Sequence, residues 1–99
     1  MSNFDGKNLT TIKVKVKEFH WMNPHAEIVV DSTDEKGETS EWRLQLGPPN
    51  QLNRLSGLNK NSFKAGDELT ISGNAYKDGS KIMRPRKIVY ADGKEVPNL

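Results

Sequence analysis

Apolar and polar residues alternate along most of this chain, a pattern typical of half-buried β-strands. In the run TTIKVKVK, Ile12, Val14 and Val16 fall on one face and lysines fall on the other. The stretches AEIVVD, from Ala26, and EWRLQL, from Glu41, alternate in the same way. Because short links join the three stretches, they predict consecutive strands of an antiparallel meander.

The first strand contains a change of phase. Phe19 and Trp21 are odd-numbered, whereas the apolar residues before them are even-numbered. One extra residue near Lys17–Glu18 would return both aromatic rings to the inner face, which is what a β-bulge does. A long, bent first strand of this kind helps a small sheet to curl into a barrel.

The hydrophobic period changes after the third strand. In GPPNQLNRLSGL, Leu52 and Leu55 lie three residues apart between two prolines and Gly57, which predicts a short helix. Alternation returns in FKAGDELTISGNAY, where Gly73 is small at a point where a strand bends or another backbone approaches. The last strand, KIMRPRKIVY, contains Pro85, which indicates a sheet edge or a bulge.

This order of elements predicts an all-β fold, a five-stranded barrel of the oligonucleotide/oligosaccharide-binding (OB) type with one short helix between strands three and four. An open sandwich or an SH3-like barrel is the alternative, which the position of the helix disfavours. The 99 residues suffice for one domain. We expect residues 10–93 to form the barrel, residues 1–9 a flexible segment and residues 94–99 a tail. No run of about eighteen apolar residues is present, so no membrane span is expected.

Composition excludes several classes of protein. The chain has no Cys, so it forms neither disulfides nor thiolate metal sites, and a soft metal would need Met and His. Its net charge of +2 is too small to mark a nucleic-acid binder. That charge is uneven: residues 1–50 carry six Lys/Arg and eight Asp/Glu (−2), and residues 51–99 carry nine and five (+4). No Gly-rich phosphate loop or nucleophile elbow occurs, so an enzyme is not expected.

Candidate chemistry gathers in HWMNPH, which contains both histidines of the chain. With WMNP as a four-residue link, His20 and His25 are expected to be directly opposed on the outer face, their Cβ atoms about 4.5–5.5 Å apart. Two imidazoles and the Met22 thioether suit a copper ion, above all Cu(I). The indole face of Trp21 would cover such an ion.

Two more residues are candidate ligand-binding positions. Asn23 lies in the same corner. Met83 lies on the last strand, where each possible alternation puts some polar residue inside, so the pattern does not decide whether Met83 faces inward or outward. A structural role is the alternative for the whole corner, since Asn-Pro starts turns and Trp21 suits a core or a barrel rim. A small ligand other than a metal ion is a third interpretation.

The alternative function from another class is binding of single-stranded nucleic acid, which OB barrels achieve with the face of strands two and three. That face carries Glu27, Asp31, Glu38 and Glu41, which repel phosphate, whereas the basic residues lie on the first and last strands. Nucleic acid is therefore not the expected partner. A role as an adaptor for a partner protein of the cell envelope stays open, and a monomer is expected.

Three segments, EFHWMNPHAEIVVD, EWRLQLGPPNQLNR and SFKAGDELTISGNAYKDGS, resemble a bacterial family of small exported proteins, domain of unknown function 6152. The resemblance covers roughly residues 10–93, and its most specific part is a W-x-N-P-H corner. The residues that fit its pattern are Trp21, Asn23, Pro24, His25, Trp42, Gly47, Pro49, Asn50, Leu52, Gly66 and Asp67.

The resemblance implies a small β-barrel and a periplasmic or otherwise exported location, and it brings no assigned activity. His20 and Met22 lie outside its pattern. The stretch MSNFDGKNLTT lacks the basic head and apolar middle of a signal peptide, so the expectation of export comes from the resemblance alone.

Overall fold

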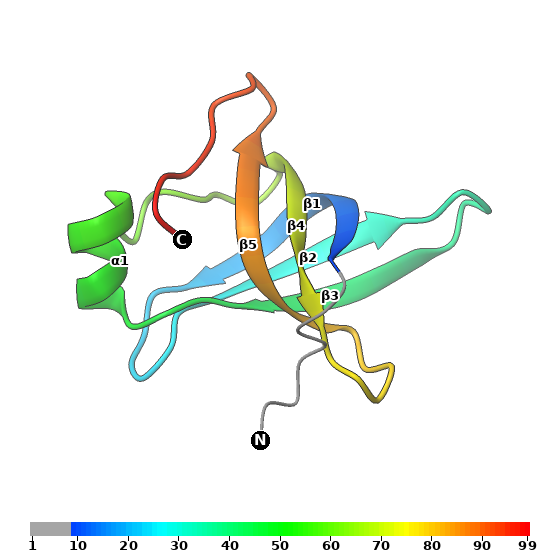
Figure 1. Ribbon diagram of the computed structural model, residues 1–99. Helices are drawn as coiled ribbons and strands as arrows, with labels where there is room; N and C mark the ends of the chain where they lie inside the picture. Colours follow the sequence, from blue (N-terminus) through cyan, green and yellow to red (C-terminus); the bar gives the residue numbers. More distant parts are fainter. Residues whose placement is uncertain (1–8) are drawn as a thin grey trace.

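The computed structural model describes residues 9–99, which form five strands and one helix (Figure 1). The elements are β1 (Thr10–His20), β2 (Glu27–Thr33), β3 (Thr39–Gln45), α1 (Pro49–Ser56), β4 (Glu68–Ala75) and β5 (Ile82–Tyr90). The predicted order of three strands, one helix and two strands is confirmed. Residues 1–8 of the expected N-terminal segment lie outside the described residues.

The strands close into a barrel in the order β1-β2-β3-β5-β4. Neighbouring strands are antiparallel except β3 and β5, which meet in parallel through the pairs Arg43↔Ile82 and Leu44↔Met83. The predicted five-stranded OB-like barrel is therefore confirmed. Closure pairs the edges that a small open sheet would leave exposed. Within residues 9–99 no helix has the length and apolar character needed to cross a membrane.

Alternating residues of the strands fill the barrel. The largest fully buried side chains that belong to this core are Val16, Ile28, Val30, Leu44, Ile71, Met83 and Ile88. Val29 lies outside the core cluster, yet only 2% of its surface is exposed. It pairs with Glu18 on β1 and Arg43 on β3, so charged side chains cover it on the outer face.

The predicted bulge in β1 is confirmed. The register between β1 and β2 shifts between Val16 and Glu18, so Lys17 is the extra residue. Phe19 and Trp21 consequently pack against the core, with their ring centroids 5.8 Å apart and edge to face. The bulge thus places Trp21 at the end of the barrel where β1 turns toward β2.

A second irregularity joins β4 to β5. The register shifts between Ser72 and Gly73, and Gly73 lies opposite Pro85 while Arg86 is the extra residue. A Cβ atom on Gly73 would lie only 2.9 Å from the Pro85 Cα. Of the alternatives expected from the sequence, the structure shows a close approach of backbones at Gly73 and a bulge in the strand that contains Pro85.

Helix α1 lies at one end of the barrel (Figure 1), where Leu52 anchors it in the core. Gly57 follows the helix with φ 70°, the left-handed conformation that ends many helices. The C-terminal residues pack beside α1: Asn98 Nδ2 donates to the Leu55 carbonyl at 3.0 Å, and Ser56 Oγ donates to the Asn98 carbonyl at 3.1 Å. Val96 is buried in the core, so the expected tail contributes to the fold.

Candidate functional site

The expected pairing of the two histidines is wrong. His20 lies opposite Glu27, and the ladder between β1 and β2 ends with that pair. The reason is long-range: the Ala26 N–H donates to the Gly47 carbonyl at 3.1 Å, and the Ala26 carbonyl accepts from Leu46 at 2.9 Å. These bonds draw the chain after the Asn23–Pro24 corner toward the end of β3 and not back along β1.

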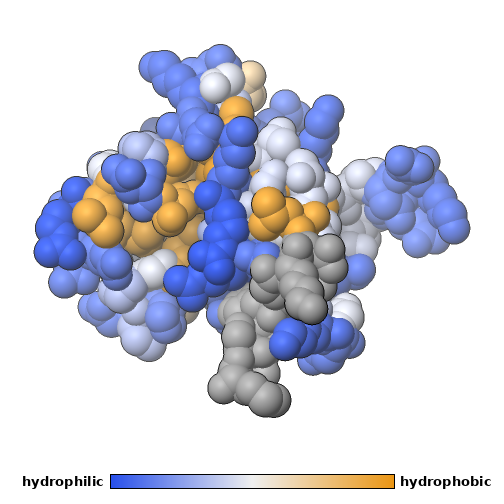
Figure 2. All heavy atoms as spheres, in the orientation of Figure 1, coloured by the Kyte–Doolittle hydropathy of each residue, from blue (hydrophilic) through white to orange (hydrophobic). Residues whose placement is uncertain are grey.

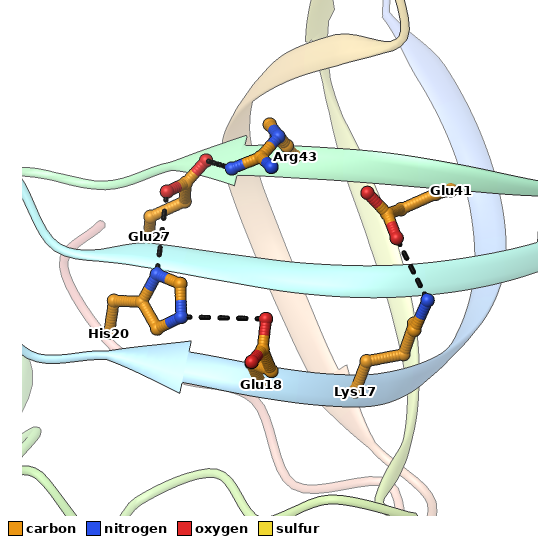
Figure 3. Close-up of polar contacts among 6 residues, drawn as sticks. All are labelled: Lys17, Glu18, His20, Glu27, Glu41 and Arg43. Carbon is orange, nitrogen blue, oxygen red and sulfur yellow. Dashed lines mark hydrogen bonds and ion pairs between the residues drawn. The ribbon is translucent and has the colours of Figure 1, made fainter.

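His20 instead lies between two carboxylates on the outer face of the sheet (Figure 3). Its Nδ1 is 3.6 Å from the Glu27 Oε2, and its Nε2 is 3.6 Å from the Glu18 Oε2. Arg43 Nη1 donates to the other oxygen of Glu27 at 3.0 Å, which raises the pKa of Arg43. Among residues 9–99, no group of three His, Asp or Glu side chains is arranged to hold a metal ion.

The same outer face carries a second ion pair. Lys17 Nζ donates to the Glu41 Oε2 at 2.8 Å and lies 3.9 Å from the Asp31 Oδ1. The hydrogen bond lowers the pKa of Glu41 and raises that of Lys17. Such exposed pairs contribute little to stability, so this face is a solvated layer over Val29.

The other proposed metal ligands lie in different surroundings. Met22 is exposed in the β1–β2 link, and His25 lines a hollow beside α1. Met83 is fully buried opposite Leu44 and Ala75, where its thioether fills the core. The structure therefore does not bring Met83 to the corner.

Trp21 and Asn23, two of the predicted ligand-binding residues, do lie together. They line a hollow of about 580 Å³ between the β1–β2 link and the first turn of α1. We call this hollow the amide cleft and define it by Trp21, Asn23, Asn50, Asn53, Asn59 and Lys60; Pro49 completes its wall.

Sequence reasoning missed the amides that α1 and the loop after it contribute. Asn50 and Asn53 lie three residues apart, so they share one face of the helix, and that spacing was a usable signal. Which loop packs against that face depends on long-range contacts, and no local pattern reports it.

The opposite side of α1 borders a second hollow, of about 300 Å³. We call it the arginine groove and define it by His25, Leu46, Leu52, Leu55, Arg84 and Arg86. Figure 2 shows apolar surface beside α1, bordered by hydrophilic surface along β5. Helix α1 thus separates two hollows of different chemistry.

Comparison with known proteins assigns the chain to a family. The model of the family of unknown function DUF6152 matches residues 1–83. The chain belongs to this family. No curated protein and no solved structure matches it. Four of the residues on which the resemblance rested, Trp21, Asn23, Pro49 and Asn50, line the amide cleft together, although they come from two separate segments of the sequence.

Proposed function

We propose that this protein is a non-catalytic binding module whose amide cleft holds a neutral, hydroxyl-rich small ligand of the carbohydrate class. The observation that carries the proposal is the convergence of Trp21 and Asn23 with the amides of Asn50, Asn53 and Asn59 in one hollow. Small-molecule sites commonly combine an aromatic surface with a few placed polar groups. OB barrels as a class bind oligosaccharides as well as oligonucleotides.

The cleft offers the groups that a sugar requires. Each Asn amide supplies donors and an acceptor, which match hydroxyl groups that both donate and accept. Asn53 Nδ2 donates to the Leu58 carbonyl at 3.0 Å, and Asn59 Oδ1 accepts from the Asn61 N–H at 2.8 Å. These bonds hold the two amides in place while leaving their other polar atoms for a ligand. The indole of Trp21 adds an apolar surface for the face of a sugar ring.

The charge of the cleft disfavours a cation as its ligand. Within the described part of the chain, Lys60 is the one charged residue that lines it, and no carboxylate does. An ammonium group repels metal ions and tolerates neutral hydroxyl groups. This charge favours a sugar over a metal ion in this hollow.

Copper capture at His20, Met22 and His25 stays a prediction from the sequence, without the histidine pairing on which it depended. Titration against a colorimetric Cu(I) chelator decides it. Withdrawal of one equivalent of copper from the chelator, lost in His25→Ala, would restore the copper hypothesis. Unchanged chelator absorbance would end it.

Nucleic-acid binding is supported less well. The basic strands β1 and β5 are separated by β4 in the barrel order, so their lysines and arginines do not adjoin through paired strands. The acidic residues on β2 and β3 hold their own cationic partners, as in the pairs Glu27–Arg43 and Glu41–Lys17. Export to the periplasm is a proposal that rests on the family resemblance, and an envelope partner and a monomeric state are proposals from the sequence.

Ligand-observed NMR with a panel of neutral oligosaccharides tests the proposal. We expect saturation transfer from the wild-type protein to at least one oligosaccharide, and about tenfold weaker binding of that oligosaccharide by Asn23→Ala and by Asn50→Ala. Asn61→Ala is the matched control, because Asn61 lies in the neighbouring loop without lining the cleft. Absence of transfer to every oligosaccharide at millimolar concentration, with the protein folded, would overturn the proposal.

A further inference from the structure

Two arginines of β5, Arg84 and Arg86, line the arginine groove, and neither has a carboxylate partner among residues 9–99. In the described part of the chain, the side chain of Arg84 makes no hydrogen bond or ion pair, and no Asp or Glu side chain lines the groove. Arg86 Nε donates to the Oδ1 of the buried Asn74 at 2.7 Å. That neutral bond fixes one edge of the Arg86 guanidinium and leaves its terminal N–H groups for another acceptor.

This arrangement differs from that of Arg43, which is paired with Glu27 on the outer face of the sheet. Two guanidinium groups that line one groove repel each other, and an anion bound in the groove relieves that repulsion while accepting charge-assisted hydrogen bonds. The bulge in β5 sets the geometry, because Arg86 is the extra residue opposite the Ser72–Gly73 step. His25 contributes an imidazole to the wall of the same groove.

The rest of the groove is apolar. Leu46 and Leu52 form its recessed part, each with 6% of its surface exposed, and Leu55 is 43% exposed at its border. Pro85 and Leu99 complete this lining. The hydrogen bonds between Asn98 and the end of α1 hold the C-terminal residues beside the helix and maintain the shape of the groove.

We propose that the arginine groove binds a single amphiphilic carboxylate, a medium-chain fatty acid, with its carboxylate between Arg84 and Arg86 and its chain against the leucines. Charge complementarity selects the head group, since a carboxylate accepts two parallel bonds from a guanidinium. The volume of about 300 Å³ lies at the small end of the range for ligand sites, which favours a medium chain over a long one. The recess of Leu46 and Leu52 favours a monomeric ligand over a membrane surface, because insertion into a bilayer requires apolar side chains that project.

Calorimetric titration of the full chain with sodium decanoate, below the concentration at which it forms micelles, tests this site. We expect saturable binding of one equivalent of decanoate. Decanol, which lacks the carboxylate, and acetate, which lacks the long alkyl chain, should each bind at least about tenfold more weakly. Arg84→Gln removes one charged donor and is expected to weaken decanoate binding by about tenfold. Since the side chain of Arg84 has no partner among the described residues, we expect this variant to keep the fold intact.

Lys87→Gln is the control, because Lys87 follows Arg86 in β5 and does not line the groove. The variant also loses an exposed ion pair with Glu95, 3.7 Å away, which contributes little to stability. Its decanoate affinity is expected to equal that of the wild type. Equal binding by Arg84→Gln and wild type, or equal weakening by Lys87→Gln, would overturn the proposal. Binding to phosphatidylglycerol vesicles without binding of decanoate would also overturn it in favour of a membrane surface, and binding of acidic peptides alone would do so in favour of a protein partner. None of these results bears on sugar binding in the amide cleft.

Discussion

The two sides of helix α1 differ in chemistry, although the helix has only eight residues and different residues of it line each hollow. On one side Asn50 and Asn53 face Trp21 across the amide cleft, and on the other Leu52 and Leu55 face the arginines of β5. An amphipathic helix usually presents its polar side to water and its apolar side to the core. Here only Leu52 reaches the core, and the apolar side continues into an open groove.

The difference shows how a small barrel can hold two sites without enlarging its core. The β1–β2 link borders the amide cleft, whereas β3, β5 and the C-terminal residues border the arginine groove. Because the helix is their common wall, a change in its anchoring affects both hollows. A change on one of its faces affects one hollow alone.

The largest expected effect comes from Leu52→Ala. Leu52 anchors α1 in the core, so its truncation should cost about 3 kcal/mol of unfolding free energy. For a domain of this size that loss lowers Tm by more than about 10 °C. Decanoate and oligosaccharide binding should weaken together, because the shared wall is displaced. Leu55→Ala is the control: Leu55 is exposed, so Tm should change little and only decanoate binding should fall. A large loss of Tm in Leu55→Ala would contradict this account of the helix.

A slightly smaller effect is expected from Gly73→Ala. The new Cβ would lie 2.9 Å from the Pro85 Cα, so the β4–β5 junction must shift at a cost of about 2 kcal/mol. The shift should displace Arg84 and Arg86 and weaken decanoate binding while oligosaccharide binding persists. In Gly47→Ala, by contrast, the added Cβ meets its nearest neighbours at 3.9 Å, an ordinary contact. Thermal unfolding of both variants measures the difference, and equal Tm losses would count against the close approach at Gly73.

Two variants are expected to change ligand affinity without changing stability, and they show whether the two hollows bind their ligands independently. Asn23→Ala is expected to weaken oligosaccharide binding by about tenfold through lost hydrogen bonds and to leave decanoate binding unchanged. Arg84→Gln should show the reverse pattern. Calorimetric titration of both variants with both ligands provides the comparison. If each variant weakened both ligands, the hollows would be one site or would be coupled.

The smallest expected effect is a pH dependence on the outer sheet face, away from α1. The hydrogen bond from Lys17 holds the pKa of Glu41 below its ordinary value of 4.5. A carboxyl whose pKa is depressed by folding stabilises the folded state above its unfolded pKa, and this contribution disappears as the pH falls through the folded pKa. The pKa of Lys17 is raised by the same hydrogen bond. Its charged ammonium group therefore continues to stabilise the folded state until the pH rises through that pKa.

Glu41→Gln should therefore lower Tm slightly at neutral pH and not at a pH well below 4.5, where the wild-type carboxyl is protonated as well. The effect is small because both side chains are exposed. Glu38→Gln serves as the control, since Glu38 has no ion pair among the described residues. Thermal unfolding at the two pH values measures it, and a difference that persists in acid would argue against the ion pair.

Most of the fold could be predicted from the sequence because its signals are local. The phase slip before Phe19 gave the bulge in β1, and Gly73 with Pro85 marked the irregular β4–β5 junction. The register of His20 could not be predicted, since it depends on bonds between Ala26 and the end of β3. The alternation in the last strand was compatible with Met83 facing either inward or outward. In the closed barrel its side chain is fully buried.

The candidate sites were predictable only in part, for the same reason. Trp21 and Asn23 were recognisable in the sequence as a corner. The other amides of the cleft belong to α1 and the loop after it, and two strands lie between the corner and α1 in the chain. The arginine groove gave a weaker signal, a basic run in KIMRPRK that is usually a solvated strand face. Its significance depends on the bulge at Arg86 and on the helix opposite, both of which require the folded chain.

Amide NMR spectra of the labelled protein, recorded with each ligand in turn, test the central claim most directly. The account predicts that an oligosaccharide shifts the Trp21 indole and the side-chain amides of Asn23, Asn50, Asn53 and Asn59, whereas decanoate shifts the backbone signals of Arg84 and Arg86. Two separate sets of shifts on the two sides of α1 would support two sites of different chemistry. A single common set, or no shifts with either ligand, would contradict it.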